Sequence, residues 1–226
     1  MAVCSTVTGR RPAGLGDADD LVHADAAIEE WCFAGWSERG DVGLVTGYRR
    51  RAGEPGWYWA ALARAGQPLL HVTEWDVPPR SDPLLVKAHG LWAEHVCEVP
   101  MQQWTVANET YAVALEDPAE ALGRAYGVLS ALAFDLEWYA TEVPERTDDG
   151  FMQRGVVHGV IELPGGPLRL EEIPAQRWRR WGDRLGPLDL PSAYAHTGVR
   201  TAFAFPDGTI ADWVLTPDGW RRRRTN

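Results

Sequence analysis

The chain has 226 residues, a formal net charge of −10 and a sequence pI of about 5.1. This length is enough for one large β domain or two small ones, and either can bury a hydrophobic core. The acidic balance argues against a nucleic-acid surface, because nucleic-acid binders concentrate positive charge. No apolar run approaches the ~20 residues needed to cross a bilayer, so we expect no membrane span.

Cysteine usage and the first residues bear on the compartment. Three cysteines cannot all pair within one chain, and none lies in a CxxC or other metal-binding spacing. The start of the sequence contains no apolar core of a secretory signal. We therefore expect a cytoplasmic protein with reduced thiols.

In chain order, the first element is a segment over 1–20 without periodicity, which predicts a flexible leader. A first β unit is predicted over 21–116, because apolar residues alternate with period two between short turns. Its expected strands are 28–36, 42–50, 56–64, 68–76, 84–98 and 103–115.

A helical connector is predicted over 117–130, with Asp117 as the N-cap and Pro118 in the first helical position. A second β unit is predicted over 131–226. Its expected strands, the first of which begins in the connector, are 130–142, 151–163, 167–173, 199–205 and 209–215.

Several strands lack a clean polar face. In 103–115, for example, Trp104 and Asn108 share one side while Glu109 and Tyr111 share the other. Two-sided strands of this kind are typical of a barrel with a lined interior that is covered outside by another sheet. The predicted fold class is therefore all-β, a barrel that comprises two packed units or one compact domain, with one short helix near mid-chain.

Twelve tryptophans stand against five phenylalanines and six tyrosines. Indoles are large and rigid, so this excess indicates a heavy β core or the lining of a cavity for a flat or lipophilic molecule. Nucleophile-elbow, dinucleotide-binding and Walker motifs are absent from the sequence, and its six histidines show no metal-binding spacing. We expect neither a metal nor a cofactor.

Glu-Trp occurs three times, at Glu30, Glu74 and Glu137, each followed by an indole on the opposite face of its strand. The plain interpretation is that the indole faces the core and the acid faces water. The functional alternative is an acid inside a cavity, where burial would make it a proton donor at neutral pH. Glu30 and Glu74 are the better candidates, because each shares a face with apolar residues. Glu137 shares its face with polar residues.

Three segments resemble a known family. "EEWCFAGW", "FDLEWYATEVPERTDDGFMQRGVVHGVIELPGG" and "RWRRWG" are similar to parts of the hydroxyneurosporene-hydratase and AttH-like group. The last corresponds to an Arg-Asp-His-Ser-Trp-Gly type motif, of which Arg177–Gly182 retains Arg, Trp and Gly. The resemblance implies a lipocalin-like barrel, and relatives that hydrate carotenoids or fold polyketide chains into [4+2] products.

Four functions remain open. The first is a cofactor-free cyclase or pericyclase acting on a lipophilic polyketide or terpenoid chain, with rate gained by holding the chain folded. The second is acid-catalysed hydration or isomerisation of a polyene. The third is a non-catalytic carrier or sensor of a lipophilic ligand, and the fourth is a β protein with a solid tryptophan-rich core and an interaction surface. The candidate catalytic residues are Glu30, Glu74 and Tyr111. The candidate substrate-binding residues are Trp36, Tyr58, Trp59, His71, Trp104, Asn108, Trp138, His158 and Trp181. His158 and Asn108 have structural alternatives, as a satisfied histidine and a cross-strand hydrogen bond. The expected partner is the lipophilic substrate, on a monomer or homodimer.

Overall fold

The computed structural model describes residues 14–123, 125–186, 199–204, 210–216 and 219–222. Two short 3₁₀-helices accompany fourteen strands in this part of the chain. The helices are η1 (Asp17–Asp20) and η2 (Pro118–Leu122). The strands are β1 (Ile28–Trp36), β2 (Val42–Arg51), β3 (Glu54–Arg64), β4 (Leu69–Val77), β5 (Leu85–Ala88), β6 (Leu91–Val99), β7 (Gln103–Leu115), β8 (Val128–Ala140), β9 (Glu145–Thr147), β10 (Gly150–Glu162), β11 (Leu168–Gly182), β12 (Val199–Ala204), β13 (Ile210–Thr216) and β14 (Gly219–Arg222).

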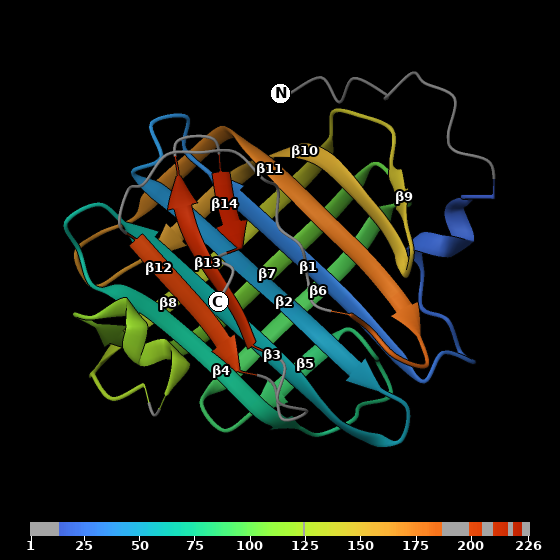
Figure 1. Cartoon of the computed structure of the whole chain (residues 1–226), viewed down its shortest axis with the longest axis horizontal. Coiled ribbons are helices and arrows are strands. Elements are labelled where there is room, and N and C mark those ends of the chain that lie inside the picture. The colour runs from blue at the N-terminus through green and yellow to red at the C-terminus, as the bar shows by residue number, and fades with distance from the viewer. Residues whose placement is uncertain (1–13, 124, 187–198, 205–209, 217–218, 223–226) are drawn as a thin grey trace.

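Eight antiparallel strands close into a barrel (Figure 1). Their order is β4-β3-β2-β1-β11-β10-β8-β7, and β7 pairs back with β4. That closing contact is short, with only three residue pairs between Leu69–His71 and Val113–Leu115. The other half of β7 pairs with β6 instead, and β5 follows β6. The expectation of an all-β, barrel-shaped fold is confirmed.

The inner faces of the barrel strands form one hydrophobic core. Because side chains alternate along a strand, Leu132, Phe134, Leu136 and Trp138 of β8 all point inward, and each is at most 3% exposed. Other members of this core are Trp31, Phe33, Leu44, Tyr48, Tyr58, Leu62, Leu70, Val72, Trp104, Val106, Val157 and Ile161. A bulge between Val157 and Gly159 bends β10, and Gly159 suits it because its φ is +136°.

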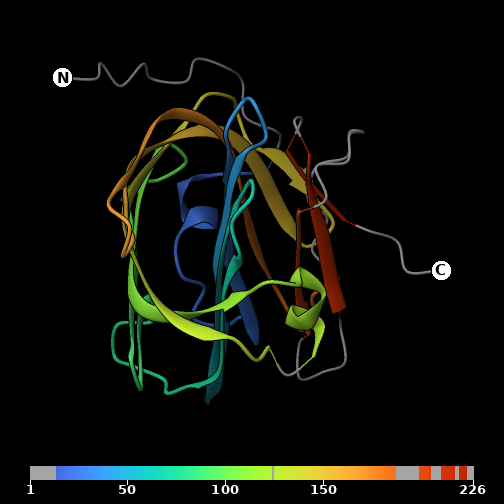
Figure 2. The same cartoon turned by 90° about the vertical axis from the view of Figure 1, so that its left-hand side faces the viewer.

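A second layer covers one side of the barrel. The three-stranded sheet β12-β13-β14 stands against this side (Figure 2). Its buried residues Trp213, Leu215 and Trp220 belong to a second core together with outward-facing residues of the barrel. Those barrel residues include Cys32, Ala34, Val45, Trp57, Trp59, Ala61, Ala63 and Trp178. Both faces of β1, β2 and β3 are therefore buried.

Several elements differ from the sequence-based expectations. The segment expected as one strand over 84–98 is a hairpin, β5 and β6, with Gly90 in the turn at φ +70°. The strand expected over 167–173 continues to Gly182 and so includes the "RWRRWG" stretch. The expected helix is the single 3₁₀ turn η2, where the Asp117 side chain accepts the Ala119 backbone NH.

The boundaries expected for two β units fall within one sheet system. Strands from 21–116 and from 131–182 form two adjoining arcs of the same barrel, because β1 pairs with β11 and β7 pairs with β8. Of the expected leader, residues 1–13 lie outside the described residues. Residues 14–20 are placed against the barrel, and Asp20 is fully buried.

Candidate functional site

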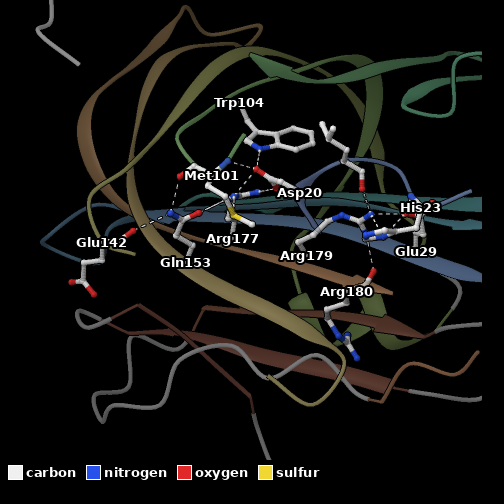
Figure 3. A network of polar contacts seen from close by, with 11 residues as sticks. Asp20, His23, Glu29, Met101, Trp104, Glu142, Gln153, Arg177, Arg179 and Arg180 are labelled. Carbon is white, nitrogen blue, oxygen red and sulfur yellow. Dashed lines mark hydrogen bonds and ion pairs between the residues drawn. The ribbon is translucent and has the colours of Figure 1, made fainter. Parts of the chain in front are cut away.

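One end of the barrel, where β1 begins and β11 ends, is closed by η1 and a buried ion pair (Figure 3). The Asp20 carboxylate accepts two NH groups of Arg177, at 2.5 and 2.9 Å. It also accepts the backbone NH of Met101 at 2.5 Å and the indole NH of Trp104 at 3.1 Å. Burial by itself raises the pKa of Asp20, but Arg177 and the other donors outweigh burial and hold the pKa below its ordinary value. Asp20 is therefore charged at neutral pH and anchors η1 to the barrel.

A second buried ion pair lies beside the first. Glu29 points inward from β1 and pairs with Arg179 of β11 and with Arg50 of β2. Arg179 also donates to the Leu21 carbonyl oxygen at 2.6 Å, and its guanidinium lies 4.1 Å from the centre of the Trp31 ring. These contacts tie the chain after η1 to the same end of the barrel. This end is thus closed by charged groups that pair with one another.

Glu30 belongs to a third ion-pair network, outside the barrel. Its carboxylate lies 2.5 Å from Arg49 and 2.8 Å from Arg180, and Arg180 also holds Asp149. Glu30 is fully buried, as its apolar face predicts. That face, however, belongs to the wall shared with the C-terminal sheet, where Cys32 is its buried neighbour on the strand. The inward acid of this Glu-Glu-Trp stretch is Glu29.

The middle of the barrel contains a small polar cluster in the apolar core. The Tyr58 hydroxyl accepts the Asn108 side-chain NH at 2.9 Å and the Thr46 hydroxyl at 3.1 Å. Thr46 lies within 3.2 Å of the Trp59 carbonyl oxygen as well. Burial raises the pKa of Tyr58, so its hydroxyl stays protonated. The side-chain oxygen of Asn108 has no hydrogen-bond partner among the described residues, although Asn108 is fully buried.

His95 on β6 is the second unusual group of the interior. It is 2% exposed, and neither ring nitrogen has a hydrogen-bond partner within the described chain. Its ring lies 5.7 Å from the ring of Phe33, centre to centre. Burial lowers the pKa of His95 to about 4, so the imidazole is neutral at pH 7. Buried polar groups are normally satisfied, so unpaired atoms on both His95 and Asn108 require an explanation.

A cavity of about 20 Å³ lies in the apolar interior. Its volume is enough for about one water molecule. Three wall residues contact the polar groups of the interior. The Phe33 ring is tilted by 31° against the His95 ring, Val106 is the cross-strand partner of His95, and Thr46 contacts Tyr58. The remaining lining residues are Ala34, Gly35, Leu44, Leu136, Trp138, Val157, Leu170 and Ile173. The polar cluster and His95 therefore flank the cavity.

Four of the expected substrate-binding residues meet inside the barrel: Tyr58, Trp104, Asn108 and Trp138. The Arg177 guanidinium lies 4.7 Å from the Trp138 ring centre and 5.6 Å from that of Trp104. Glu74, one of the expected acids, is on the inner face of β4 opposite Tyr58 and is half-buried. Glu74 is thus a strand neighbour of one expected binding residue, and its carboxylate accepts the Asp76 backbone NH at 3.2 Å in an exposed contact.

The other expected residues lie elsewhere. Trp36, Trp59 and His71 are on outer faces of the barrel, where Trp36 and Trp59 belong to the second core. His71 contacts the Thr73 hydroxyl at 2.9 Å, and burial lowers the pKa of His71 to about 4. These residues contribute to the packing of the barrel wall and do not line the interior cavity.

The last three expected residues lie far from one another, and none of them lines the interior cavity. Trp181 packs against Phe151 at the closed end, with 6.3 Å between ring centres. His158 is on the outside of β10, 5.6 Å from the Tyr139 ring. Tyr111 is 66% exposed and lines a surface hollow of about 500 Å³ over β7 and β8. No lining residue of this hollow is shared with the interior cavity.

Sequence reasoning missed His95, Asp20 and the inward arginines of β11. His95 lies in the segment that was expected as one long strand, so its face could not be assigned. Alternation in "RWRRWG" does place Arg177 and Arg179 on one face. An inward arginine needs a buried acidic partner, and the partner of Arg177 is Asp20, which lies 157 positions away in the chain. The sequence does not show this pairing.

Two other features are absent from the described residues. No group of three or more His, Cys, Asp or Glu side chains that could hold a metal ion occurs among them. None of the described helices is long and apolar enough to cross a membrane. Comparisons with protein-family models, curated proteins and solved structures gave no match. The resemblance to the hydroxyneurosporene-hydratase group therefore stays a prediction.

Proposed function

We propose that this protein binds a lipophilic small molecule inside its barrel and acts as a carrier or sensor. The observation that carries the proposal is the interior itself, where a closed ring of strands surrounds an apolar, aromatic-lined cavity. Small eight-stranded barrels are either filled by side chains or hold one small ligand. Ligand pockets are typically apolar with a few polar groups. The lining of this cavity is apolar apart from Thr46, and the polar side chains of Tyr58 and His95 lie behind it, against Thr46 and Phe33.

Entry of a ligand requires movement, because the cavity has room for about one water molecule. The weakest part of the wall is the seam between β4 and β5. These strands are neighbours, but no hydrogen-bonded pairing joins them in this fully described part of the chain. Only three residue pairs hold β4 to β7 beyond the seam. Separation of β4 from β5 would expose the inner face without breaking a ladder, and it is the route we propose for the ligand.

Binding can be tested with the tryptophans of the interior as reporters. Trp31, Trp104 and Trp138 all belong to the inner core, so a ligand in the barrel should change their fluorescence. The protein would be titrated with linear polyenes and with long-chain β-dicarbonyl compounds, and each mixture would then be analysed by chromatography. Saturable quenching at about one equivalent, with the ligand recovered unchanged, supports a carrier. Absence of saturable quenching by every compound contradicts the proposal.

A cofactor-free cyclase or isomerase is the second candidate. Glu74 favours it, because this half-buried acid occupies the inner face of β4 directly opposite Tyr58. A carboxyl at this position could move a proton on a bound polyene, and the aromatic walls could hold a chain in a folded conformation. The acid version requires that Glu74→Gln abolish product formation while Glu171→Gln, a change of an exposed glutamate, does not. Isomeric product formed equally by both variants would instead favour a cyclase that works by shape alone.

A further inference from the structure

We propose that His95 and Asn108 form the polar anchor of the barrel and that they select a neutral ligand with an amide-type headgroup. This inference rests on the proposed binding function and names the chemical class of the ligand. It starts from three buried polar atoms without a partner in the described chain: both ring nitrogens of His95 and the side-chain oxygen of Asn108. Such atoms in an otherwise apolar core indicate a missing hydrogen-bonding partner.

The two residues are close enough to contact one headgroup. On the paired strands β6 and β7, Ala93 lies opposite Asn108 and His95 lies opposite Val106. All four residues are at most 2% exposed and share the inner face. His95 and Asn108 are therefore diagonal cross-strand neighbours, a relation that puts Cα atoms about 7–8 Å apart. A single planar group of a few atoms can span this distance.

The free atoms define which hydrogen bonds the headgroup must make. The side-chain NH₂ of Asn108 donates one hydrogen to Tyr58, which leaves the Asn108 oxygen as an acceptor and the second N–H as a donor. Neutral His95 offers one ring N–H donor and one ring nitrogen acceptor. Two acceptors and two donors on the protein are complementary to two N–H donors and the two lone pairs of a carbonyl oxygen on the ligand. A primary carboxamide supplies this set, whereas an ester supplies acceptors only.

The charges around the interior exclude an anionic headgroup. The three arginines of the inner face, Arg50, Arg177 and Arg179, already bind the carboxylates of Glu29 and Asp20. His95 carries no charge at neutral pH because burial lowers its pKa to about 4. A buried carboxylate without a cationic partner is strongly unfavourable. A fatty acid in its ionised form should therefore bind more weakly than the amide of the same chain.

The experiment compares decanamide, methyl decanoate and decanoate at pH 7.5 by quenching of tryptophan fluorescence. We expect the amide to bind at least tenfold more tightly than the ester and the carboxylate, because an unmatched buried polar group is costly. In His95→Phe and Asn108→Leu, the preference for the amide over the ester should fall below threefold. His158→Phe is the matched control, since His158 lies outside the barrel, and it should keep the wild-type preference.

The outcomes separate this inference from the proposed function. Equal binding of all three compounds would leave the lipophilic binding site standing and overturn the anchor. Tightest binding of decanoate would overturn the neutral headgroup. If none of the compounds quenches, the anchor is overturned, and the proposed function is decided by the titration with polyenes and β-dicarbonyl compounds. The wild-type comparison alone decides these cases, even if an anchor variant does not fold.

Discussion

The ion pair between Asp20 and Arg177 gives the sharpest prediction about stability. Asp20→Asn keeps the shape of the side chain and removes its charge, while Arg177 stays 1% exposed with only neutral side-chain oxygens, the new amide oxygen and that of Gln153, as acceptors. Removal of one partner from a buried pair costs roughly 3–5 kcal/mol. Small proteins have urea m-values of about 1–3 kcal/mol/M, and a chain of this size lies near the upper end. The urea midpoint should therefore fall by roughly 1–2 M.

The assay is equilibrium unfolding in urea at pH 7, followed by tryptophan fluorescence and circular dichroism. Asp25→Asn is the control, because Asp25 is exposed and its loss removes the same charge. The folded-state pKa of Asp20 is below its ordinary value, so the stabilisation is present above pH 3.8 and is lost as the pH falls through the lower, folded-state pKa. The gap between wild type and Asp20→Asn should accordingly close in strong acid. A midpoint shift no larger than that of Asp25→Asn would refute the anchoring of η1 by this pair.

Three further predictions concern other parts of the barrel. The pKa of His95 is about 4 in the folded protein and 6.5 normally, so unfolding takes up a proton between pH 4 and 6.5. The melting temperature should therefore fall as the pH drops from 6.5 to 4, and it should fall less in His95→Phe. Gly47→Ala should lower the free energy of unfolding, measured in urea, by about 1–3 kcal/mol, because the new Cβ would lie 2.4 Å from the Trp59 ring. Gly53→Ala is the control. Its Cβ would meet open space, and its φ of +73° should cost about 1 kcal/mol or less. Glu30→Gln should lower the melting temperature without changing ligand affinity, since Glu30 lies outside the barrel interior; an altered affinity would contradict this placement.

The sequence was most informative where one face of a strand alternates cleanly. In β8, alternation in the sequence places Leu132, Phe134, Leu136 and Trp138 on one face, and that face belongs to the inner core. Alternation could not say which face of β1 is the inside, because the C-terminal sheet buries the other face as well. Glu29 and Glu30 are both fully buried for this reason, each with arginines from neighbouring strands.

The candidate site was less predictable than the fold, because long-range pairing creates it. Tyr58 and Asn108 were each expected to contact a ligand, but their mutual hydrogen bond depends on strands 50 positions apart. The inward orientation of His95 is known only from the structure, in which the β5–β6 hairpin places its side chain on the inner face. Trp59 and His71 are among the expected binding residues, yet both side chains face outward from the barrel.

The central claim is that a lipophilic molecule occupies the interior of the barrel. It is tested most directly by methyl NMR during a titration with decanamide, because the cavity is lined by Leu44, Val106, Leu136 and Val157. We predict chemical-shift changes at these methyl groups that saturate at one equivalent, with little change at Val96 and Val99, which are exposed on β6. Changes confined to the exposed valines, or no saturable change at all, would contradict the account.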